Sequence, residues 1–294
     1  MTSFKVAPLA DRGVVRVSGA DAAKLLQGLI TADLDLLDKQ PSIFSGLLTP
    51  QGKILFDFFI VKSGEGFLLE TLREKTADLV KRLTFYKLRA KADIVDVSEA
   101  KSVAALWGGP ELSIEGAVVV YPDPRRGELG WRAIAPAGFD WTSISGAEIA
   151  TEQVYHEHRI SVGVPDGGRD YVLGDTFPHE ALFDQIGGVS FGKGCFVGQE
   201  VVSRMEHRST ARKRVVPVVG QESLQAGSEV KAGEAVIGTV GSVAGNRGLA
   251  LLRLDRAGEA MSKGQPITAG GASVSIGLPS WVRFGIPSKD AAQV

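Results

Sequence analysis

Apolar positions follow two kinds of pattern over the first two hundred residues. Short runs rich in β-branched and aromatic residues favour strands, and between them leucine, valine and alanine recur at helical spacing. Residues 49–53 (TPQGK) separate two such runs as a turn and predict a hairpin. The predicted strands cover 14–17, 43–48, 54–61, 67–70, 93–98, 102–107, 117–121 and 130–135, and the predicted helices cover 20–30, 73–86 and 149–160. Strands and helices do not alternate strictly, which favours an α+β fold.

The pattern changes near residue 210, where we place a domain boundary between 1–210 and 211–294. Beyond it, short strand-like runs alternate with glycine-containing turns at regular spacing. This spacing is typical of a small β-barrel or sandwich. The runs are 215–219, 229–231, 235–243, 248–254 and 272–276.

Composition sets limits on function. Of the 294 residues, 44% are hydrophobic and 23% are charged, which is enough to bury a substantial core. The formal net charge of −1 gives no overall attraction to nucleic acid or to an acidic membrane. The first residues lack the apolar segment of a secretory signal, and no apolar run approaches the roughly 18–20 residues that span a bilayer. One cysteine cannot form an internal disulfide, so we expect a cytoplasmic protein without a membrane partner.

That cysteine, Cys195, lies in the run K-G-C-F-V-G-Q-E at residues 193–200. A lone thiol cannot supply the four thiolates that usually hold an iron–sulfur cluster, so a cluster here needs ligands from another molecule. Two interpretations stay open: a small buried hydrophobic residue, or a reactive thiol whose pKa Lys193 lowers if the two side chains converge. The glycines around it predict a backbone that turns sharply or is closely approached.

Two carboxylates lie in apolar surroundings. Asp57 lies among three phenylalanines on a predicted strand, either facing solvent or hydrogen-bonding a heterocyclic ligand. Glu180 lies in the run F-P-H-E-A-L-F. It either accepts two parallel hydrogen bonds from the planar edge of a pterin or purine, or stabilises a helix N-terminus. Both are candidate ligand-binding residues.

The run from Arg204 to Arg214 holds five lysines or arginines, one histidine and one acidic residue. It suits a polyanion such as tRNA, a polyglutamyl tail or an acidic partner, but a solvated linker between domains has the same composition. No aromatic residue lies within it, which weakens the nucleic-acid interpretation. The chain also has no P-loop, no dinucleotide-binding glycine motif, no hydrolase nucleophile elbow and no zinc-protease motif.

Residues 193–200 closely resemble the K-G-C-Y-x-G-Q-E motif of YgfZ-type folate-binding proteins, which are relatives of the glycine cleavage T-protein, an aminomethyltransferase. Three further stretches agree with that family: G-A-D-A-A-K-L-L-Q-G-L-I-T-A-D at 19–33, R-I-S-V-G-V-P at 159–165 and F-P-H-E at 177–180. The resemblance covers about residues 5–285. It implies a three-lobed, T-protein-like fold in which two mixed α+β lobes and the C-terminal β-barrel surround a folate pocket.

The resemblance also implies a role in the assembly or repair of iron–sulfur proteins, in particular those with 4Fe–4S clusters, with tetrahydrofolate as the ligand. The implied partners are A-type iron–sulfur carriers and iron–sulfur client enzymes. The family cysteine falls on Cys195, as a reactive thiol or as one ligand of a transient cluster shared with a partner. The T-protein glutamate that holds the pterin falls on Glu180, and Asp57 and Gln199 complete the expected folate-binding set. The matched motif consists of Lys193, Gly194, Cys195, Gly198, Gln199 and Glu200.

Two departures argue against a glycine cleavage enzyme. T-proteins carry G-G-x-x-D-D where residues 52–57 read G-K-I-L-F-D, so only Asp57 of the acidic pair remains. T-proteins tend to have F-I-G-R and no cysteine where residues 196–199 read F-V-G-Q behind Cys195. We therefore expect a folate-binding accessory protein rather than an enzyme. The alternatives are a tetrahydrofolate-dependent one-carbon (aminomethyl) transferase using Asp57, and a tRNA-modification factor binding through 204–214.

Overall fold

The chain forms two compact units, and each draws on two separate stretches of sequence. The computed structural model describes residues 4–64, 66–109, 114–207 and 211–287. The first unit combines the described chain up to Tyr155 with residues 186–199. The second combines His156–Gln185 with the described chain from Glu200 onward. The division at residue 210 expected from the sequence stays a prediction.

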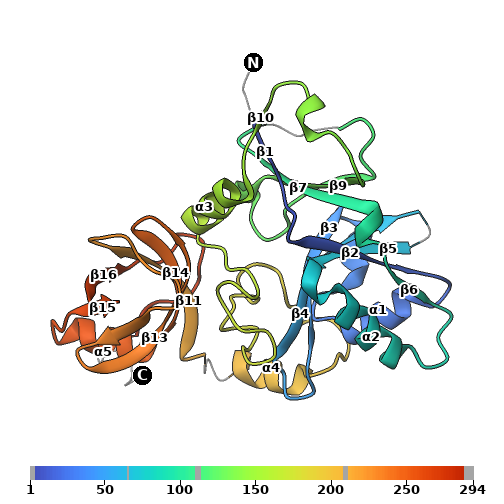
Figure 1. The fold of residues 1–294 in the computed structure, drawn as a ribbon. Coiled ribbons are helices and arrows are strands. Elements are labelled where there is room, and N and C mark those ends of the chain that lie inside the picture. Colours follow the sequence, from blue (N-terminus) through green and yellow to red (C-terminus); the bar gives the residue numbers. More distant parts are fainter. Residues whose placement is uncertain (1–3, 65, 110–113, 208–210, 288–294) are drawn as a thin grey trace. The chain divides into compact units, whose positions relative to one another are not determined.

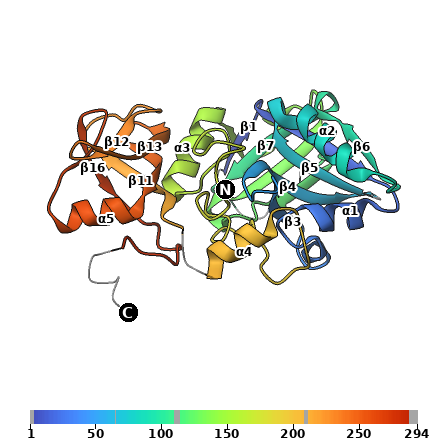
Figure 2. The ribbon, with the colours of Figure 1, turned by 90° about the horizontal axis from the view of Figure 1, so that it is seen from below.

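One sheet of the first unit is antiparallel throughout and carries two helices on one face (Figures 1 and 2). In spatial order its strands are β3 (Ser42–Leu48), β4 (Ile54–Ser63), β5 (Gly66–Leu72), β2 (Arg12–Ser18) and β6 (Asp93–Asp96), and the helices are α1 (Ala22–Leu29) and α2 (Thr76–Lys87). Leu26 of α1 and Leu83 of α2 share one apolar core with Phe58 of β4. Because side chains alternate along a strand, Asp57 lies on the other face of β4. The hairpin predicted around 49–53 is confirmed.

A second five-stranded sheet completes the first unit. In spatial order its strands are β10 (Ala147–Ile149), β1 (Phe4–Pro8), β7 (Lys101–Trp107), β9 (Trp131–Pro136) and β8 (Val119–Pro122). Only the pair of β1 with β10 is parallel among these pairings. The sequence patterns missed both of these strands. The helix expected from residue 149 begins at Glu152 instead, because residues 147–149 pair with β1.

A buried ionic network joins the two sheets of the first unit. Arg12 on β2 donates from Nε to Oε1 of Glu70 on β5 at 2.9 Å. Arg132 on β9 donates from Nε to Oε2 of the same carboxylate at 2.9 Å, and the hydroxyl of Tyr121 on β8 also donates to it. Glu70 therefore binds one cationic donor from each sheet and a neutral donor from the sheet that contains β8 and β9.

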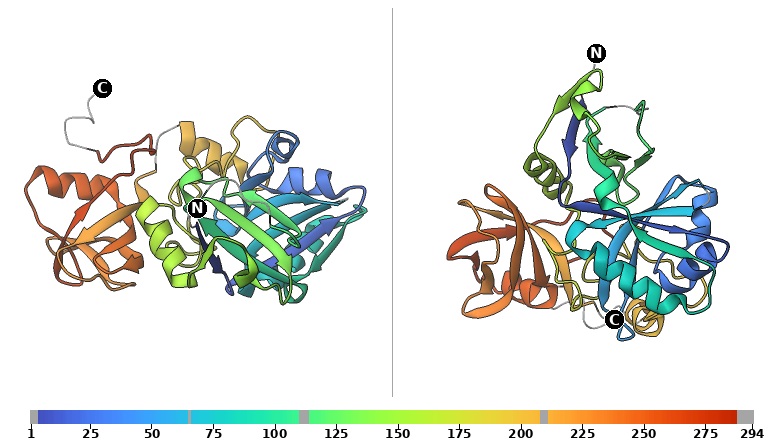
Figure 3. Two further views of the ribbon diagram at one scale, coloured as in Figure 1. Left: turned by 90° about the horizontal axis from the view of Figure 1, so that it is seen from above. Right: turned by 45° about the vertical axis from the view of Figure 1, so that its right-hand side comes forward.

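The second unit contains a closed, antiparallel β-barrel, which confirms the barrel expected after residue 210 (Figure 3). Around the barrel the strands are β11 (Lys213–Gly220), β14 (Arg247–Arg253), β13 (Ala235–Ala244), β12 (Glu229–Ala232), β15 (Ile267–Ala269) and β16 (Ala272–Ile276), and β16 pairs again with β11. Helix α5 (Leu254–Ser262) packs against the barrel. The sequence missed α5 because its buried positions include Ala257, Gly258 and Ala260, which are too small to mark an apolar face.

Helices α3 (Glu152–Val162) and α4 (Gln199–His207) lie where the chain passes from the first unit into the second. Arg159 of α3 is fully buried and donates to Oδ2 of Asp170 at 2.6 Å and to Oγ of Ser242 on β13 at 2.7 Å. Short 3-10 helices are η1 (Leu34–Asp38), η2 (Arg73–Lys75), η3 (Ser98–Ala100), η4 (Gly127–Leu129) and η5 (Trp141–Ser143). Within the described ranges, no helix has both the length and the apolar character needed to cross a bilayer.

Candidate functional site

Cys195 is exposed, on the loop that leads into α4. This excludes the interpretation of a small buried hydrophobic residue. The loop belongs to the first unit, although the stretches on both sides of 186–199 belong to the second. The thiol of Cys195 therefore lies on a segment of the first unit and is accessible to another molecule.

Lys193 anchors this loop from within. Its ammonium donates to the carbonyl oxygens of Gln27, Ile30 and Ala32, each at 2.8 Å. Burial lowers the pKa of Lys193 to about 8, against the opposing effect of the carboxylates of Asp33 and Asp35.

The loop is also fixed through Thr31. Its hydroxyl donates to the carbonyl oxygen of Gly188 at 2.6 Å, and its own carbonyl accepts the backbone N–H of Ser190 at 2.9 Å. The same hydroxyl accepts the N–H of Gly46 on β3 at 2.8 Å. One threonine therefore connects the start of the loop to the strand that pairs with β4.

Gly198 is the motif glycine whose backbone position requires glycine. Its φ is +81°, and a Cβ there would lie 2.7 Å from the carbonyl oxygen of Thr49 and 3.0 Å from Cα of Gly52. The β3–β4 turn is therefore approached closely, as the sequence predicted for this run. Around Gly192 and Gly194 a Cβ would meet nothing within 4 Å, so close approach does not explain those glycines.

Asp57 is buried, with 3% of its surface exposed, which contradicts the solvent-facing interpretation. It pairs with Gly46 across β3 and β4, and its carbonyl oxygen accepts the hydroxyl of Thr71 at 2.7 Å. Because Thr31 binds Gly46 and also holds the loop at 188–190, Asp57 and the Cys195 loop are built on adjoining backbone of one unit.

The remaining predicted residues are divided between the units. Gln199, half-buried at the start of α4, belongs to the first unit, whereas Glu200 and Glu180 belong to the second. Oε2 of Glu180 accepts the N–H of Phe177 at 2.9 Å. Residues 178–187 form turns, so the helix N-terminus expected as an alternative for Glu180 is absent from that described stretch.

Much of the basic run 204–214 is committed to intramolecular contacts. Arg204 pairs with Glu200 at 2.6 Å. Arg214 is buried, donates to Asp184 at 2.9 Å and to the carbonyl oxygen of His179 at 3.0 Å, and stacks on a phenylalanine ring. Residues 208–210 lie outside the described ranges. The polyanion interpretation therefore loses the buried Arg214, whereas Arg204 stays exposed beside Glu200.

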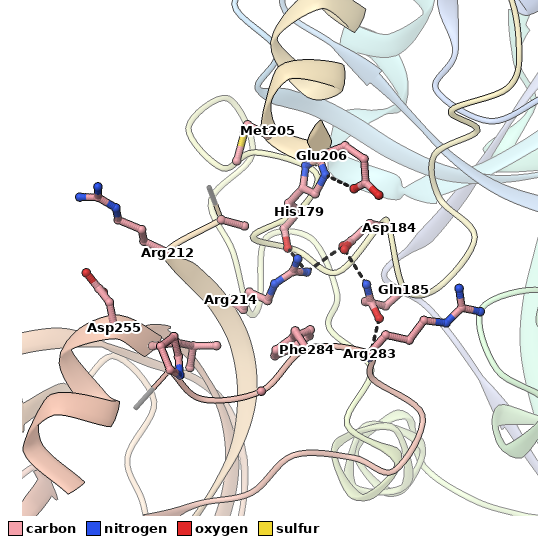
Figure 4. Close-up of a pocket in the computed structure, with 14 residues that line it drawn as sticks. His179, Asp184, Gln185, Met205, Glu206, Arg212, Arg214, Asp255, Arg283 and Phe284 are labelled. Carbon is pink, nitrogen blue, oxygen red and sulfur yellow. Dashed lines mark hydrogen bonds and ion pairs between the residues drawn. The ribbon is translucent and has the colours of Figure 1, made fainter. Parts of the chain in front are cut away.

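A cavity of about 430 Å³ within the second unit, which no sequence pattern predicted, is lined in part by His179, Asp184, Glu206 and Arg214 (Figure 4). One ligand-type atom from each of His179, Asp184 and Glu206 lies within 4.8 Å of the others. Arg214 already neutralises Asp184, so a metal cation there would face its positive charge. These residues come from two short stretches, 179–184 and 206–214, which only folding brings together, so no single motif marks the cavity.

Comparison with known proteins decides the family. Residues 212–284 match the family model described as the C-terminal beta-barrel domain of CAF17. The iron-sulfur cluster assembly factor IBA57 of Homo sapiens is 33% identical over 273 residues, which are 82% of this chain and 75% of the human protein. This chain belongs to the IBA57 family. The Mus musculus member is 32% identical over the same shares of the two chains.

Two fungal IBA57 homologues are matched over a smaller share of their length. The chain spans little more than half of these relatives, 57% for Mycosarcoma maydis and 52% for Neurospora crassa, at 33% and 31% identity. These relatives are named as mitochondrial proteins, as are the human and mouse members. The cytoplasmic location expected from the sequence is therefore contradicted.

The fold of this IBA57-family chain is that of the glycine cleavage T-protein. Aminomethyltransferase T from Bartonella henselae superposes with a TM-score of 0.77 at 18% identity, over 96% of this chain and 87% of that protein. At this identity the likeness shows the fold alone. It confirms the T-protein-like α+β class with a C-terminal barrel.

Proposed function

We propose that this chain acts in the assembly or repair of iron–sulfur proteins, with Cys195 supplying one thiolate to a cluster shared with a partner. The observation that carries the proposal is the exposed thiol on a loop held by the first unit, in a chain of the IBA57 family. The chain has a single cysteine, so three further ligands have to come from elsewhere. When this chain supplies only one of the ligands, the Cys195 thiolate can be replaced by a thiolate of a recipient protein, which suits a protein that passes a cluster on.

The narrower YgfZ-type assignment rests on the K-G-C-F-V-G-Q-E run at 193–200. With it comes tetrahydrofolate as the ligand, for which we propose Asp57, Glu180 and Gln199 as contacts. Asp57 is buried on β4, and its partner strand β3 is tied to the Cys195 loop through Thr31, so these candidate residues belong to one part of the first unit. A-type carriers and iron–sulfur client enzymes are the proposed partners.

The test is anaerobic mixing with an A-type carrier that holds a 2Fe–2S cluster, followed by visible absorption and complex size. Wild-type protein is expected to form a coloured heterocomplex, and Cys195→Ser is expected to abolish it because an alcohol is a poor ligand for iron in a thiolate cluster. Ser190→Ala, nearby on the same loop, serves as the matched control and should leave the complex intact. A complex indifferent to Cys195→Ser would reject the shared ligation.

A one-carbon transferase is the second candidate, and the burial of Asp57 is the observation that favours it. The two functions differ in their dependence on the thiol. A transferase should retain tetrahydrofolate-dependent turnover in Cys195→Ser and lose it in Asp57→Asn. The proposed accessory role predicts no turnover in either protein.

A further inference from the structure

We infer that Lys193 is the positioning residue of Cys195: its ammonium docks the thiol-bearing loop onto the C-terminal end of α1. The inference rests on the proposed role of Cys195 as a cluster ligand. Its structural half, the docking of the loop, is measurable without any cluster.

One acceptor, the carbonyl of Gln27, lies in the last turn of α1, and the carbonyls of Ile30 and Ala32 belong to the residues that directly follow the helix. The last helical bond of α1 runs from the N–H of Ile30 to the carbonyl oxygen of Leu26. The N–H of Thr31, which would bind the carbonyl of Gln27 in a longer helix, donates to Gly46 instead. The carbonyls at this end also carry the negative pole of the helix, which favours a cation.

Lys193 fits this end completely. An ammonium has three N–H donors and no acceptor, and each donor has a carbonyl 2.8 Å away. The residue is only 8% exposed, whereas Cys195, two positions later, is exposed. Two residues of chain reach at most about 7 Å, so a fixed ammonium confines the backbone that carries the thiol.

The positions on the other side of Cys195 are fixed as well. The ring of Phe196 is buried and lies 5.5 Å from the Lys193 ammonium, and Gly198 packs against the β3–β4 turn. The thiol therefore projects from a segment held at both ends. Because this segment is already ordered before the carrier protein binds, Cys195 loses less conformational freedom when it becomes a ligand of the cluster.

The geometry also separates positioning from activation of the thiol. Activation needs the ammonium to donate to the Cys195 sulfur or to lie against it as a counter-ion. All three donors of Lys193 are bound to carbonyls of the segment 27–32, so the residue has no N–H for the sulfur. We therefore assign the effect of Lys193 to the backbone, and the arginine variant described below tests a counter-ion effect separately.

The test compares Lys193→Met with Lys24→Met, the same change at an exposed position of α1. In the isolated protein, hydrogen exchange of the loop 188–198 should become at least tenfold faster in Lys193→Met and stay unchanged in Lys24→Met. The rate at which iodoacetamide alkylates Cys195 is a second measure of loop mobility, and it should change in Lys193→Met and stay unchanged in Lys24→Met. Lys193→Gln, which keeps two donors, replaces Lys193→Met should the latter not fold.

The second measurement is the dissociation constant of the heterocomplex with the loaded carrier. Lys193→Met should weaken it at least tenfold while leaving its absorption spectrum per complex unchanged, because Cys195 is still the ligand. Lys193→Arg keeps the charge but cannot converge on three carbonyls, so it should not rescue binding. Rescue by arginine would overturn positioning in favour of a charge effect on the thiol.

The remaining outcomes are also decisive. Unchanged exchange of the loop in Lys193→Met would reject docking. Faster exchange with unchanged affinity would show that docking does not serve the complex and would overturn the inference. If the wild-type protein forms no complex, the proposed function fails, while the exchange measurement still decides whether Lys193 docks the loop.

Discussion

At the scale of single residues, Glu70 stays charged inside the first unit although it is fully buried. Burial raises the pKa of a carboxyl group, but the charges of Arg132 and Arg12 outweigh this effect and hold the pKa of Glu70 at about 2. Burial and the same carboxylate raise the pKa of Tyr121 well above its usual range, so the hydroxyl stays a donor. The network therefore depends on one ionised group.

We predict that this network makes the first unit sensitive to acid. The pKa of Glu70 is lower in the folded chain than its ordinary 4.5, so the folded state binds fewer protons and its contribution is complete above pH 4.5. It is lost as the pH falls from about 4.5 to 2, and about 2 kcal/mol disappears between pH 7 and pH 3. The free energy of unfolding in urea should be measured at both pH values. Glu70→Gln should be less stable than wild type at pH 7 but should not lose this further ~2 kcal/mol at pH 3. Glu74→Gln, at an exposed position, should keep it, and an equal pH dependence in Glu70→Gln would contradict the prediction.

Gly198 provides a second prediction at this scale. Gly198→Ala should destabilise the first unit by about 2 kcal/mol, because alanine is strained at φ +81° and its Cβ would lie 2.7 Å from the carbonyl oxygen of Thr49. Gly194→Ala, where the added methyl group meets open space, should change stability by less than about 0.5 kcal/mol. Urea unfolding followed by tryptophan fluorescence measures both. Equal effects of the two changes would show that the close approach is unimportant.

At the scale of elements, Arg159 ties α3 to the barrel strand β13 through Asp170 and Ser242. Oδ1 of Asp170 also accepts the N–H of Ser242 at 2.8 Å, so the carboxylate binds both elements directly. A helix, a loop and a strand that are distant in sequence therefore depend on one buried ion pair.

Removing the cation should be costly. Arg159→Met leaves the carboxylate of Asp170 buried, and we expect the second unit to lose about 3–5 kcal/mol of stability. Trp281 reports this unit, since its Nε1 donates to the carbonyl oxygen of Val162 at 3.0 Å. Its fluorescence should show unfolding at lower urea in Arg159→Met. Arg256→Met, at an exposed position of α5, is the control, and a similar shift in both variants would refute the ion-pair argument.

At the scale of the whole molecule, the sequence predicted the elements whose pairing partners lie close by in the chain, and it missed those that depend on distant residues. The β3–β4 hairpin and every barrel strand except β15 were visible because apolar runs and turn residues lie next to each other, whereas the three residues of β15 are too few to form a run. Strand β1 was missed because it is short and is completed by Ala147–Ile149, far along the chain. For the same reason, the sequence left open whether Cys195 is buried and whether Lys193 faces it. Both depend on carbonyls at residues 27–32 that only folding brings to the loop.

The first unit is closed by residues 186–199, which follow thirty residues of the second unit along the chain. Synthesis proceeds from the N-terminus, so the carbonyls that receive Lys193 exist before Lys193 itself. At 5–20 residues per second, roughly 10 to 30 s separate the two. The ribosome therefore synthesises the acceptor segment 27–32 well before the loop that carries Cys195. When the thiol of Cys195 emerges, the residues that position its loop are already present in the nascent chain.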